Sequence, residues 1–267
     1  SNEIIEFVAH ALLGPDTNIV VSEYCFAIYP IVAHLTGADC ITVPAKDFGH
    51  DLAATRRAIT PETRIVFVAN PNNPTGTLAS AETVHALLED FPDHALLVMD
   101  EAYFEFLDEP IDLVPLLAER PNLLLMRTFS KIHGLAGLRV DYGIGHPDFV
   151  AALEKVRQPF NLNALAQAAA RAALADDEHV RSTRQANDEG LKQLESGLSE
   201  LGIETVPSFA NFILAKVGDG QSIFAGLQAR GIITRPMAGY QLPEWIRISI
   251  GTTAENERCL AALTELR

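Results

Sequence analysis

Residues 64–70 read RIVFVAN, a run of five apolar residues that ends in a polar side chain. Apolar residues in consecutive positions suit a strand buried on both faces, as in a parallel sheet covered by helices. The pattern recurs between Asn18 and Gly145 in NIVVS (18–22), CITVP (40–44), ALLVMDE (95–101), NLLLMRTFS (122–130) and VDYGIG (140–145). Helical or turn segments separate these runs. The alternation predicts an α/β fold with a mostly parallel sheet sandwiched by helices.

The pattern becomes helical after residue 147 and then changes again after residue 202. Helical segments are expected at 147–158 and 164–177, followed by a long charged helix that Gly202 ends. Short strand-like runs then alternate with further helices, in IETVP (203–207), NFILAKV (211–217), IITRPM (232–237) and WIRISIG (245–251). We therefore predict a large domain over residues 1–175 and a smaller α+β domain over residues 176–267, joined by the long helix.

The composition excludes several classes of function. The chain has 267 residues, 48% of them hydrophobic, and a net charge of −15 without a block of Lys or Arg, which argues against nucleic acid or an anionic membrane surface as a partner. Its apolar runs are too short to span a bilayer. The three cysteines, Cys25, Cys40 and Cys259, are far apart and form no metal-binding motif, so we expect neither a metal site nor disulfides. A cytoplasmic location is the default expectation.

Polar side chains follow three of the expected strands where each strand ends. Asn73 lies in the proline-rich turn NPNNPTG (70–76), Asp100 and Tyr103 lie in DEAY (100–103), and Ser130 and Lys131 lie in TFSK (128–131). Ligands of open α/β sheets bind outside the carboxyl ends of the strands, so these side chains are candidates for one site.

Each of these residues also has an ordinary structural explanation. Asparagine is common in turns, and an aspartate after a strand often caps a helix. Lys131 alone would be a surface charge, and Arg139 in GLAGLR (134–139) could extend from a helix into solvent. Together, an amine, an acid, a phenol, an amide, a hydroxyl and a guanidinium at one sheet edge favour a cofactor that carries a phosphate.

Four motifs, NPNNPTG, DEAYFEF, TFSKIHGLAGLR and RISIG, resemble in order and spacing those of the fold-type I pyridoxal-phosphate aminotransferases. Within that family the set is most similar to the histidinol-phosphate aminotransferases, and the resemblance covers the whole chain. It implies that Lys131 binds the cofactor covalently and moves the proton, and that Asp100 pairs with the pyridine nitrogen. It also implies that Tyr103 and Asn73 contact the phenolic oxygen of the cofactor.

The same resemblance assigns the remaining cofactor contacts. Ser130 and Arg139 would bind the cofactor phosphate, together with the loop that holds Ser1 and Asn2 at the start of the first helix. Phe26 stands where the family stacks an aromatic ring on the cofactor, although a place in the hydrophobic core is an equal alternative.

The substrate assignment depends on two arginines of the C-terminal part. The resemblance implies that Arg247 and Arg235 bind the phosphate of histidinol phosphate, with Asn2 adding an amide, in a transamination that uses 2-oxoglutarate as acceptor. Alternatives are an aromatic amino-acid aminotransferase, a phosphate-lyase or decarboxylase on the same scaffold, and an inactive homologue that serves for binding or assembly.

The resemblance also implies features outside the cofactor site. The family has an N-terminal section before the position of Ser1, so this chain is expected to be truncated. A homodimer is expected because active sites of the family take residues from both subunits. His133 and Asn211 remain without an assigned role.

Overall fold

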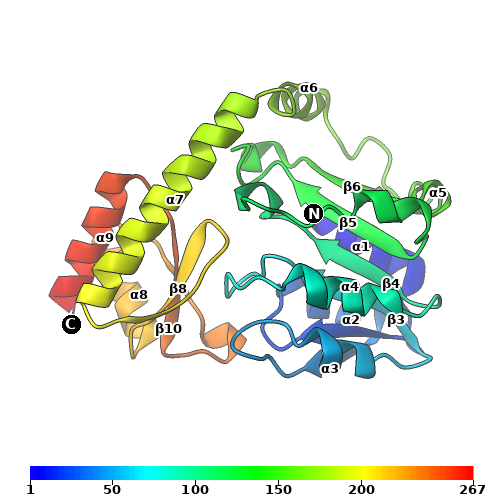
Figure 1. Ribbon diagram of the computed structural model, residues 1–267, viewed down its shortest axis with the longest axis horizontal. Coiled ribbons are helices and arrows are strands. Elements are labelled where there is room, and N and C mark those ends of the chain that lie inside the picture. Colours follow the sequence, from blue (N-terminus) through cyan, green and yellow to red (C-terminus); the bar gives the residue numbers. More distant parts are fainter. Residues whose placement is uncertain (267) are drawn as a thin grey trace.

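The computed structural model describes residues 1–266 and arranges them around two separate β-sheets (Figure 1). The larger sheet has six strands in the order β2-β1-β3-β4-β5-β6. They are β1 (Asn18–Ser22), β2 (Asp39–Val43), β3 (Thr63–Ala69), β4 (Leu96–Asp100), β5 (Leu123–Thr128) and β6 (Asp141–Gly145). Neighbouring strands from β2 to β5 pair in parallel, whereas β6 is antiparallel to β5. The prediction of a mostly parallel sheet is confirmed.

The expectation that every run is buried on both faces is wrong for the two outer strands. All residues of β1 and β4 are buried, whereas only Val43 is buried in β2 and no residue is buried in β6. The reason is their place in the sheet, because β2 and β6 are the edge strands and each has a neighbouring strand on one side only.

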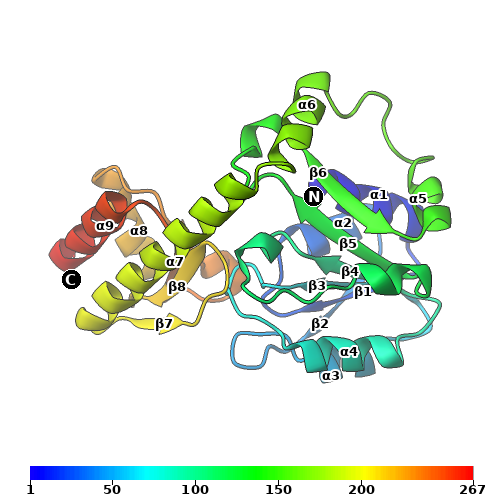
Figure 2. The same cartoon turned by 45° about the horizontal axis from the view of Figure 1, so that its top comes forward.

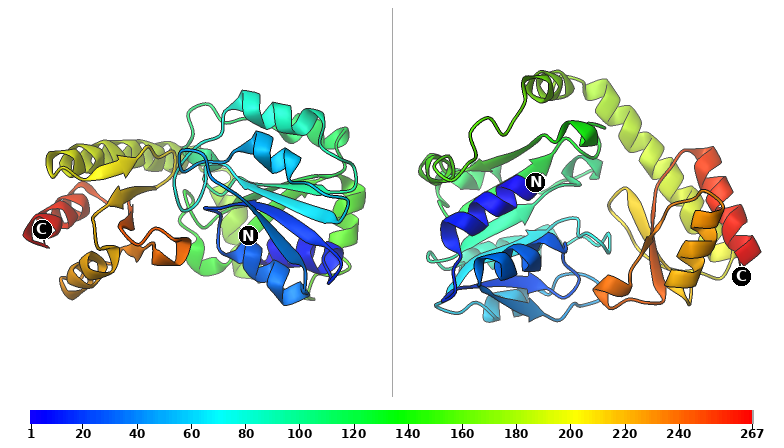
Figure 3. Two further views of the ribbon diagram at one scale, coloured as in Figure 1. Left: turned by 90° about the horizontal axis from the view of Figure 1, so that it is seen from below. Right: turned by 180° about the vertical axis from the view of Figure 1, so that it is seen from behind.

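Helices cover both faces of the larger sheet. Ile65 and Phe67 of β3 pack in the core under α1 (Asn2–Leu12), α2 (Ile28–Thr36) and α5 (Pro147–Leu153). The alternate residues Val66 and Val68 pack under α3 (Leu52–Arg57), α4 (Ala81–Glu89) and the 3-10 helix η2 (Val114–Ala118). Successive side chains of a strand point to opposite faces, so one run of apolar residues supplies both cores. Figure 3 shows α1 and α2 on one side of the sheet and α3 and α4 on the other.

The smaller sheet is antiparallel and has its own core. Its order is β7-β8-β10-β9, with strands β7 (Glu204–Val206), β8 (Phe212–Lys216), β9 (Arg235–Pro236) and β10 (Trp245–Ser249). Ile213 and Ile246 pack with apolar residues of α7 (Asp177–Glu200), α8 (Gly220–Ala229) and α9 (Thr253–Leu266). This α+β arrangement confirms the predicted fold class.

The long helix α7 connects the two parts. It follows α6 (Ala164–Ala173), begins beside the larger sheet and runs along the smaller one (Figure 2). Asp176 caps it by accepting a hydrogen bond from the His179 amide, and Gly202 follows it with a positive φ of 66°. The boundary predicted between residues 175 and 176 stays a prediction, and residue 267 of the second predicted domain lies outside the described residues.

The carboxyl ends of the parallel strands face the smaller sheet. The Phe209 amide, just before β8, donates a hydrogen bond to the Gly76 carbonyl in the turn after β3, and the N···O distance is 2.8 Å. Arg184 of α7 likewise donates from Nε to the carbonyl of Glu105, in the 3-10 helix η1 (Phe104–Phe106) that follows β4. Two further 3-10 helices are η3 (Ala136–Leu138) and η4 (Ala238–Tyr240). Over residues 1–266, no helix combines the length and apolar character needed to cross a membrane.

Candidate active site

A cavity of about 270 Å³ lies at the carboxyl ends of β3, β4 and β5. All nine predicted cofactor-binding residues line it: Ser1, Asn2, Phe26, Asn73, Asp100, Tyr103, Ser130, Lys131 and Arg139. Residues that are far apart in the sequence meet here because parallel strands end at the same edge of a sheet. The structure therefore brings together the amine, acid, phenol, amide, hydroxyl and guanidinium that the sequence motifs singled out.

Asp100, the last residue of β4, is 5% exposed and is held through both carboxylate oxygens. Tyr29 donates from its hydroxyl to Oδ2 across 2.6 Å, and the Ala102 amide donates to Oδ1 across 3.1 Å. Burial raises the pKa of the Asp100 carboxyl above its ordinary value, and the hydrogen bond from Tyr29 opposes that rise. The carboxyl group is thus fixed in position, and donated hydrogen bonds favour its ionised form.

Lys131 follows β5 and is half-buried at the cavity wall. Burial lowers the pKa of its amine, and the positive charge of Arg247 lowers that pKa further. Its Nζ lies 5.3 Å from the centre of the Tyr103 ring. A lysine with a lowered pKa has more neutral amine, which is the form that attacks a carbonyl carbon.

The turn after β3 is anchored by its own asparagines. Asn70 Oδ1 accepts a hydrogen bond from the Ala79 amide, and Asn72 Nδ2 donates to the Tyr24 carbonyl. Asn73 lines the cavity, and its Oδ1 accepts a hydrogen bond from Nη1 of Arg247. The amide nitrogen of Asn73 is then the donor that it can offer to an oxygen of a ligand.

Tyr103 and Phe26 form the aromatic part of the wall. Tyr103 is buried and packs edge-on against Phe212 of β8, with ring centres 5.3 Å apart. Burial raises the pKa of its hydroxyl, so this group stays protonated and can donate to an oxygen. Phe26 lines the cavity and also packs on the core at the edge of Tyr29, so both of its expected roles agree with its position.

Three groups in the lining of the cavity suit a phosphate. Arg139 lies in the left-handed region, with φ of 54°, and its Nη1 donates to the Ala136 carbonyl. Ser130 lines the same cavity, and its amide donates a hydrogen bond to Thr128 Oγ1. Ser1 precedes α1 and its side chain makes no capping hydrogen bond, so the first amides of the helix remain available. Free amides and the helix dipole at an N-terminus attract anions.

The two predicted substrate arginines lie beside this cavity rather than in its wall. Arg247 on β10 and Arg235 on β9 are register partners, so their side chains lie close together on neighbouring strands. Arg247 is half-buried over the Phe212 ring, 4.7 Å from its centre, whereas Arg235 is exposed. Burial lowers the pKa of Arg247, and the nearby charge of Arg235 lowers it further. The pair therefore forms a local positive charge on an acidic protein.

Three residues of the site were not predicted from the motifs. Tyr29 bonds Asp100, Thr128 bonds Ser130, and Asp141 lines the cavity at the start of β6. Tyr29 could have been suspected because it lies only three residues after Phe26 in the sequence and is an aromatic ring with a polar hydroxyl. No feature of the sequence marks Asp141 as a site residue, because it stands at the start of a strand rather than after one.

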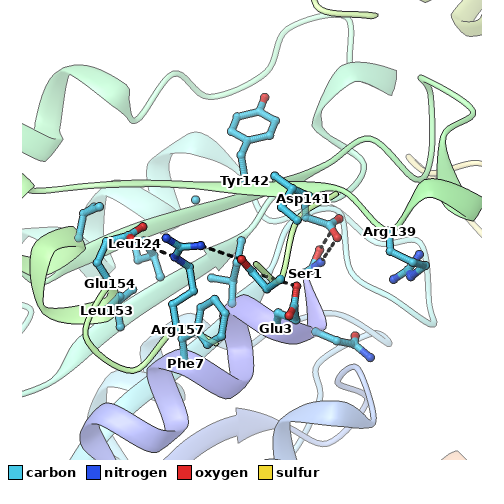
Figure 4. A pocket seen from close by; sticks show the side chains of 16 residues that line it. Ser1, Glu3, Phe7, Leu124, Arg139, Asp141, Tyr142, Leu153, Glu154 and Arg157 are labelled. Atoms are coloured by element: carbon cyan, nitrogen blue, oxygen red, sulfur yellow. Dashed lines mark hydrogen bonds and ion pairs between the residues drawn. The ribbon is translucent and has the colours of Figure 1, made fainter. Parts of the chain in front are cut away.

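A second cavity, of about 610 Å³, adjoins the first and shares four of its residues. Figure 4 shows Ser1 and Asp141 pointing towards each other, with Arg139 farther along the same wall. Arg139 lines both cavities. Ser1 Oγ donates to Asp141 Oδ1 across 3.4 Å. Among residues 1–266, no group of three or more His, Cys, Asp and Glu side chains could hold a metal ion.

His133 and Asn211 lie near the site but not in the smaller cavity. His133 is buried beside Phe129, with Nε2 3.9 Å from Glu105 Oε1. Asn211 immediately precedes β8, and its carbonyl accepts a hydrogen bond from the Ile250 amide.

Comparison with known proteins gives a consistent result. The family described as aminotransferase class I and II matches residues 1–263. A histidinol-phosphate aminotransferase of Akkermansia muciniphila is 49% identical over 267 residues, which is all of this chain and 74% of that protein. Histidinol-phosphate aminotransferase 1 of Thiobacillus denitrificans is 51% identical over 268 residues, all of this chain and 70% of that protein. The chain thus spans roughly 70% of the length of these relatives.

Solved structures agree with the sequence relatives. The histidinol-phosphate aminotransferase of Sinorhizobium meliloti, in complex with pyridoxal 5'-phosphate, superposes with a TM-score of 0.92 at 29% identity, over 98% of this chain and 73% of that one. The aspartate aminotransferase of Thermus thermophilus with maleate gives 0.88 at 25% identity, over 99% of this chain and 74% of that one. The resemblance predicted from the motifs is confirmed, and the chain belongs to the class I and II aminotransferase family.

Proposed function

We propose that this protein transfers the amino group of histidinol phosphate to 2-oxoglutarate with pyridoxal phosphate as cofactor, giving imidazole acetol phosphate and glutamate. The observation that carries the proposal is one cavity that combines the Lys131 amine, the Asp100 carboxylate and phosphate-binding donors. Relatives about half identical over the whole chain carry the name of this enzyme. They favour histidinol phosphate over an aromatic amino acid as the donor.

The chemistry of the donor set fits pyridoxal phosphate. Asp100 is an acceptor for a protonated ring nitrogen, and the Tyr103 hydroxyl and the Asn73 amide are donors for a ring oxygen. Ser130, Arg139 and the amides that begin α1 can hold a dianion. The volume of about 270 Å³ is small, at the lower end of the usual range of ligand sites, which suits one ring and its phosphate.

When bound, pyridoxal phosphate supplies an electron sink that stabilises negative charge at the substrate α-carbon. Lys131 would hold the cofactor through its neutral amine, with the carbonyl oxygen of the cofactor leaving as water. Once the substrate amine has displaced it, the freed Nζ would move a proton. Its lowered pKa suits both tasks, because a base works best when its pKa is near the operating pH. Asp100 would keep the ring nitrogen protonated, and Arg139 would hold the phosphate end in place.

Arg247 and Arg235 would bind the phosphate of the substrate. Two guanidinium groups on neighbouring strands present planar sets of donors that match phosphate oxygens. Arg247 also bonds Asn73, so it would link the substrate site to the cofactor site. Asn2, at the rim of the cavity, can add an amide to either ligand.

We further propose that the active unit is a homodimer in the cytoplasm. Phe160 is 97% exposed and Leu165 is 78% exposed, on the segment that connects α5 to α6 and in the first turn of α6. Large apolar side chains exposed on one segment are typical of an interaction surface. Measurement of the molecular mass in solution tests the dimer, and a monomeric mass for the active protein would contradict it.

The cofactor and the donor are tested in sequence. Incubation with pyridoxal phosphate should give a visible absorption band that is absent from Lys131→Ala, and an unchanged band in that variant would refute the enzymatic proposal. Histidinol phosphate should then bleach the band of the wild type faster than phenylalanine does. Equal or faster bleaching by phenylalanine would select the aromatic aminotransferase instead. Release of inorganic phosphate or carbon dioxide would indicate a lyase or a decarboxylase, and binding without any turnover would indicate an inactive homologue.

A further inference from the structure

Tyr29 and Asp100 form a short buried hydrogen bond at the floor of the cofactor cavity. The hydroxyl of Tyr29 lies 2.6 Å from Asp100 Oδ2, and the two residues are 0% and 5% exposed. A distance between about 2.5 and 2.7 Å is typical of a hydroxyl that donates to an ionised carboxylate. The hydrogen bond is therefore a strong one, and its acceptor, Asp100, lines the cavity.

Packing fixes the Tyr29 ring in the position from which it donates. The ring stacks on Phe67 of β3 with centres 4.3 Å apart and an angle of 3° between the planes, and Phe26 packs against it edge-on. Because β3 is the neighbour of β4 in the sheet, the stack ties the hydroxyl to the strand that carries Asp100. The hydroxyl cannot turn away without leaving this stack.

The hydrogen bond favours one charge state of Asp100. Burial favours the neutral acid, whereas donors aimed at the carboxylate oxygens favour the anion. Burial raises the pKa of Tyr29 itself well above its ordinary value, so its hydroxyl keeps the proton and acts only as a donor. The other titratable groups around the pair are Lys131, Tyr103, Cys25 and the amino group of Ser1.

We propose that Tyr29 is a positioning residue that keeps Asp100 ionised and aimed at the ring nitrogen of the cofactor. The Ala102 amide holds the other oxygen, Oδ1, so the two donors fix the plane of the carboxylate from opposite ends. The lone pairs that remain are available to the cavity, which Asp100 lines. This inference rests on the proposed function, since it needs pyridoxal phosphate in the cavity.

The test uses pyridoxal phosphate that is isotope-labelled at its ring nitrogen and follows the protonation of that nitrogen by NMR. In the wild type the nitrogen should stay protonated over a wide pH range. In Tyr29→Phe, which keeps the ring and removes only the hydroxyl, the pH at which the nitrogen loses its proton should fall by about one to two units. A midpoint unchanged from the wild type would overturn the inference.

Two controls separate the hydroxyl from packing and from Asp100. Phe67→Leu weakens the stack but keeps the hydroxyl, so its midpoint should lie between those of the wild type and Tyr29→Phe, and a larger fall than that of Tyr29→Phe would overturn the inference. Asp100→Asn should lower the midpoint at least as much as Tyr29→Phe does. The double variant Asp100→Asn, Tyr29→Phe should have the same midpoint as Asp100→Asn alone. An additional shift in the double variant would show that Tyr29 does not act through Asp100.

A further measurement tests the inference even if Tyr29→Phe folds poorly. Site-specific 3-fluorotyrosine at position 29 preserves the ring and makes its hydroxyl a stronger donor, so the midpoint should rise, and a fall would contradict the inference. Failure of the wild type itself to bind the labelled cofactor would refute the proposed function rather than the role of Tyr29.

Discussion

Arg247, on the smaller sheet, donates a hydrogen bond to the side-chain oxygen of Asn73, in a turn of the larger sheet, although 174 positions separate the two residues. Arg247 also lies over the ring of Phe212 on the neighbouring strand β8. The contact joins the two sheets at the edge of the cofactor cavity. The geometry of the site therefore depends on how the sheets are placed relative to each other.

The contact between Arg247 and Asn73 should contribute to stability. A double-mutant cycle of Arg247→Ala and Asn73→Ala should give a coupling of about 1–2 kcal/mol in the free energy of unfolding, as expected for a partly buried hydrogen bond to a charged group. Denaturant unfolding of the two single variants and the double variant measures it. Arg235→Ala with Asn73→Ala is the matched control and should give a coupling near zero. A similar coupling in both cycles would contradict the prediction.

The charge of Arg247 should also set the reactivity of Lys131. Arg247 lowers the pKa of the Lys131 amine and Asp141 raises it, so Arg247→Ala should raise that pKa and Asp141→Asn should lower it. Because the neutral amine reacts, the pH profile for capture of pyridoxal phosphate should move to higher pH in the first variant and to lower pH in the second. The rate at which the absorption band of the bound cofactor forms, measured as a function of pH, gives the profile of each variant. Shifts in the same direction would refute the electrostatic explanation.

Arg235 should affect only substrates that carry a phosphate. In Arg235→Ala the KM for histidinol phosphate should rise about 10-fold or more, which corresponds to the loss of one charge-assisted hydrogen bond. The rate with phenylalanine should stay within about two-fold of the wild type, because Arg235 is exposed and supports no part of the core. Steady-state kinetics with both donors checks this, and an equal loss for both would place Arg235 in a structural role.

His50 should make the fold less stable in acid. Its Nε2 lies 2.8 Å from the carbonyl oxygen of Ala69, just before the turn that holds Asn73, and burial lowers the pKa of His50 below 6.5. Below the ordinary pKa the unfolded chain binds a proton that the folded chain resists, so the free energy of unfolding falls as pH drops from about 7 to about 5. The slope from this residue is at most about 1.4 kcal/mol per pH unit.

The measurement for His50 compares denaturant unfolding of the wild type and His50→Gln across this pH range. The glutamine has an amide donor for the same carbonyl but cannot take up a proton. The free energy of unfolding of the wild type minus that of His50→Gln should therefore decrease as the pH falls. His94→Gln is the control, since it makes the same substitution at an exposed histidine. A constant difference between the wild type and His50→Gln would contradict the prediction.

Gly76 should be required for the turn that presents Asn73. Its φ is 82°, and a Cβ atom there would lie 2.8 Å from Ser208 Cβ. Gly202 also has a positive φ, of 66°, but a Cβ atom there meets nothing within 4 Å. Gly202→Ala should therefore cost about 1 kcal/mol of stability from the backbone alone, and Gly76→Ala roughly 1–3 kcal/mol more. Thermal or denaturant unfolding measures both, and equal losses would show that the close approach of Ser208 is unimportant.

Local patterns in the sequence predicted the fold class, which the structure confirms, and the resemblance to the family supplied most of the candidate residues. Consecutive apolar residues in β1, β3 and β4 predict strands buried on both faces, because successive side chains of a strand point to opposite faces of the sheet. Polar residues at or just beyond the carboxyl ends of strands, such as Asp100 and Lys131, meet at one sheet edge because the strands are parallel. The motif spacing then pointed to the family that the comparisons confirm.

The tertiary structure decided everything that depends on pairs distant in the sequence. The order of the strands leaves β2 and β6 at the edges, so their apolar runs are not buried as the others are. The contacts of Tyr29 with Asp100 and of Arg247 with Asn73 join separate elements, and no local pattern encodes them. The physical reason is that hydrophobic periodicity reports which face of an element is buried, whereas the partner of a particular polar group is set by how the elements pack.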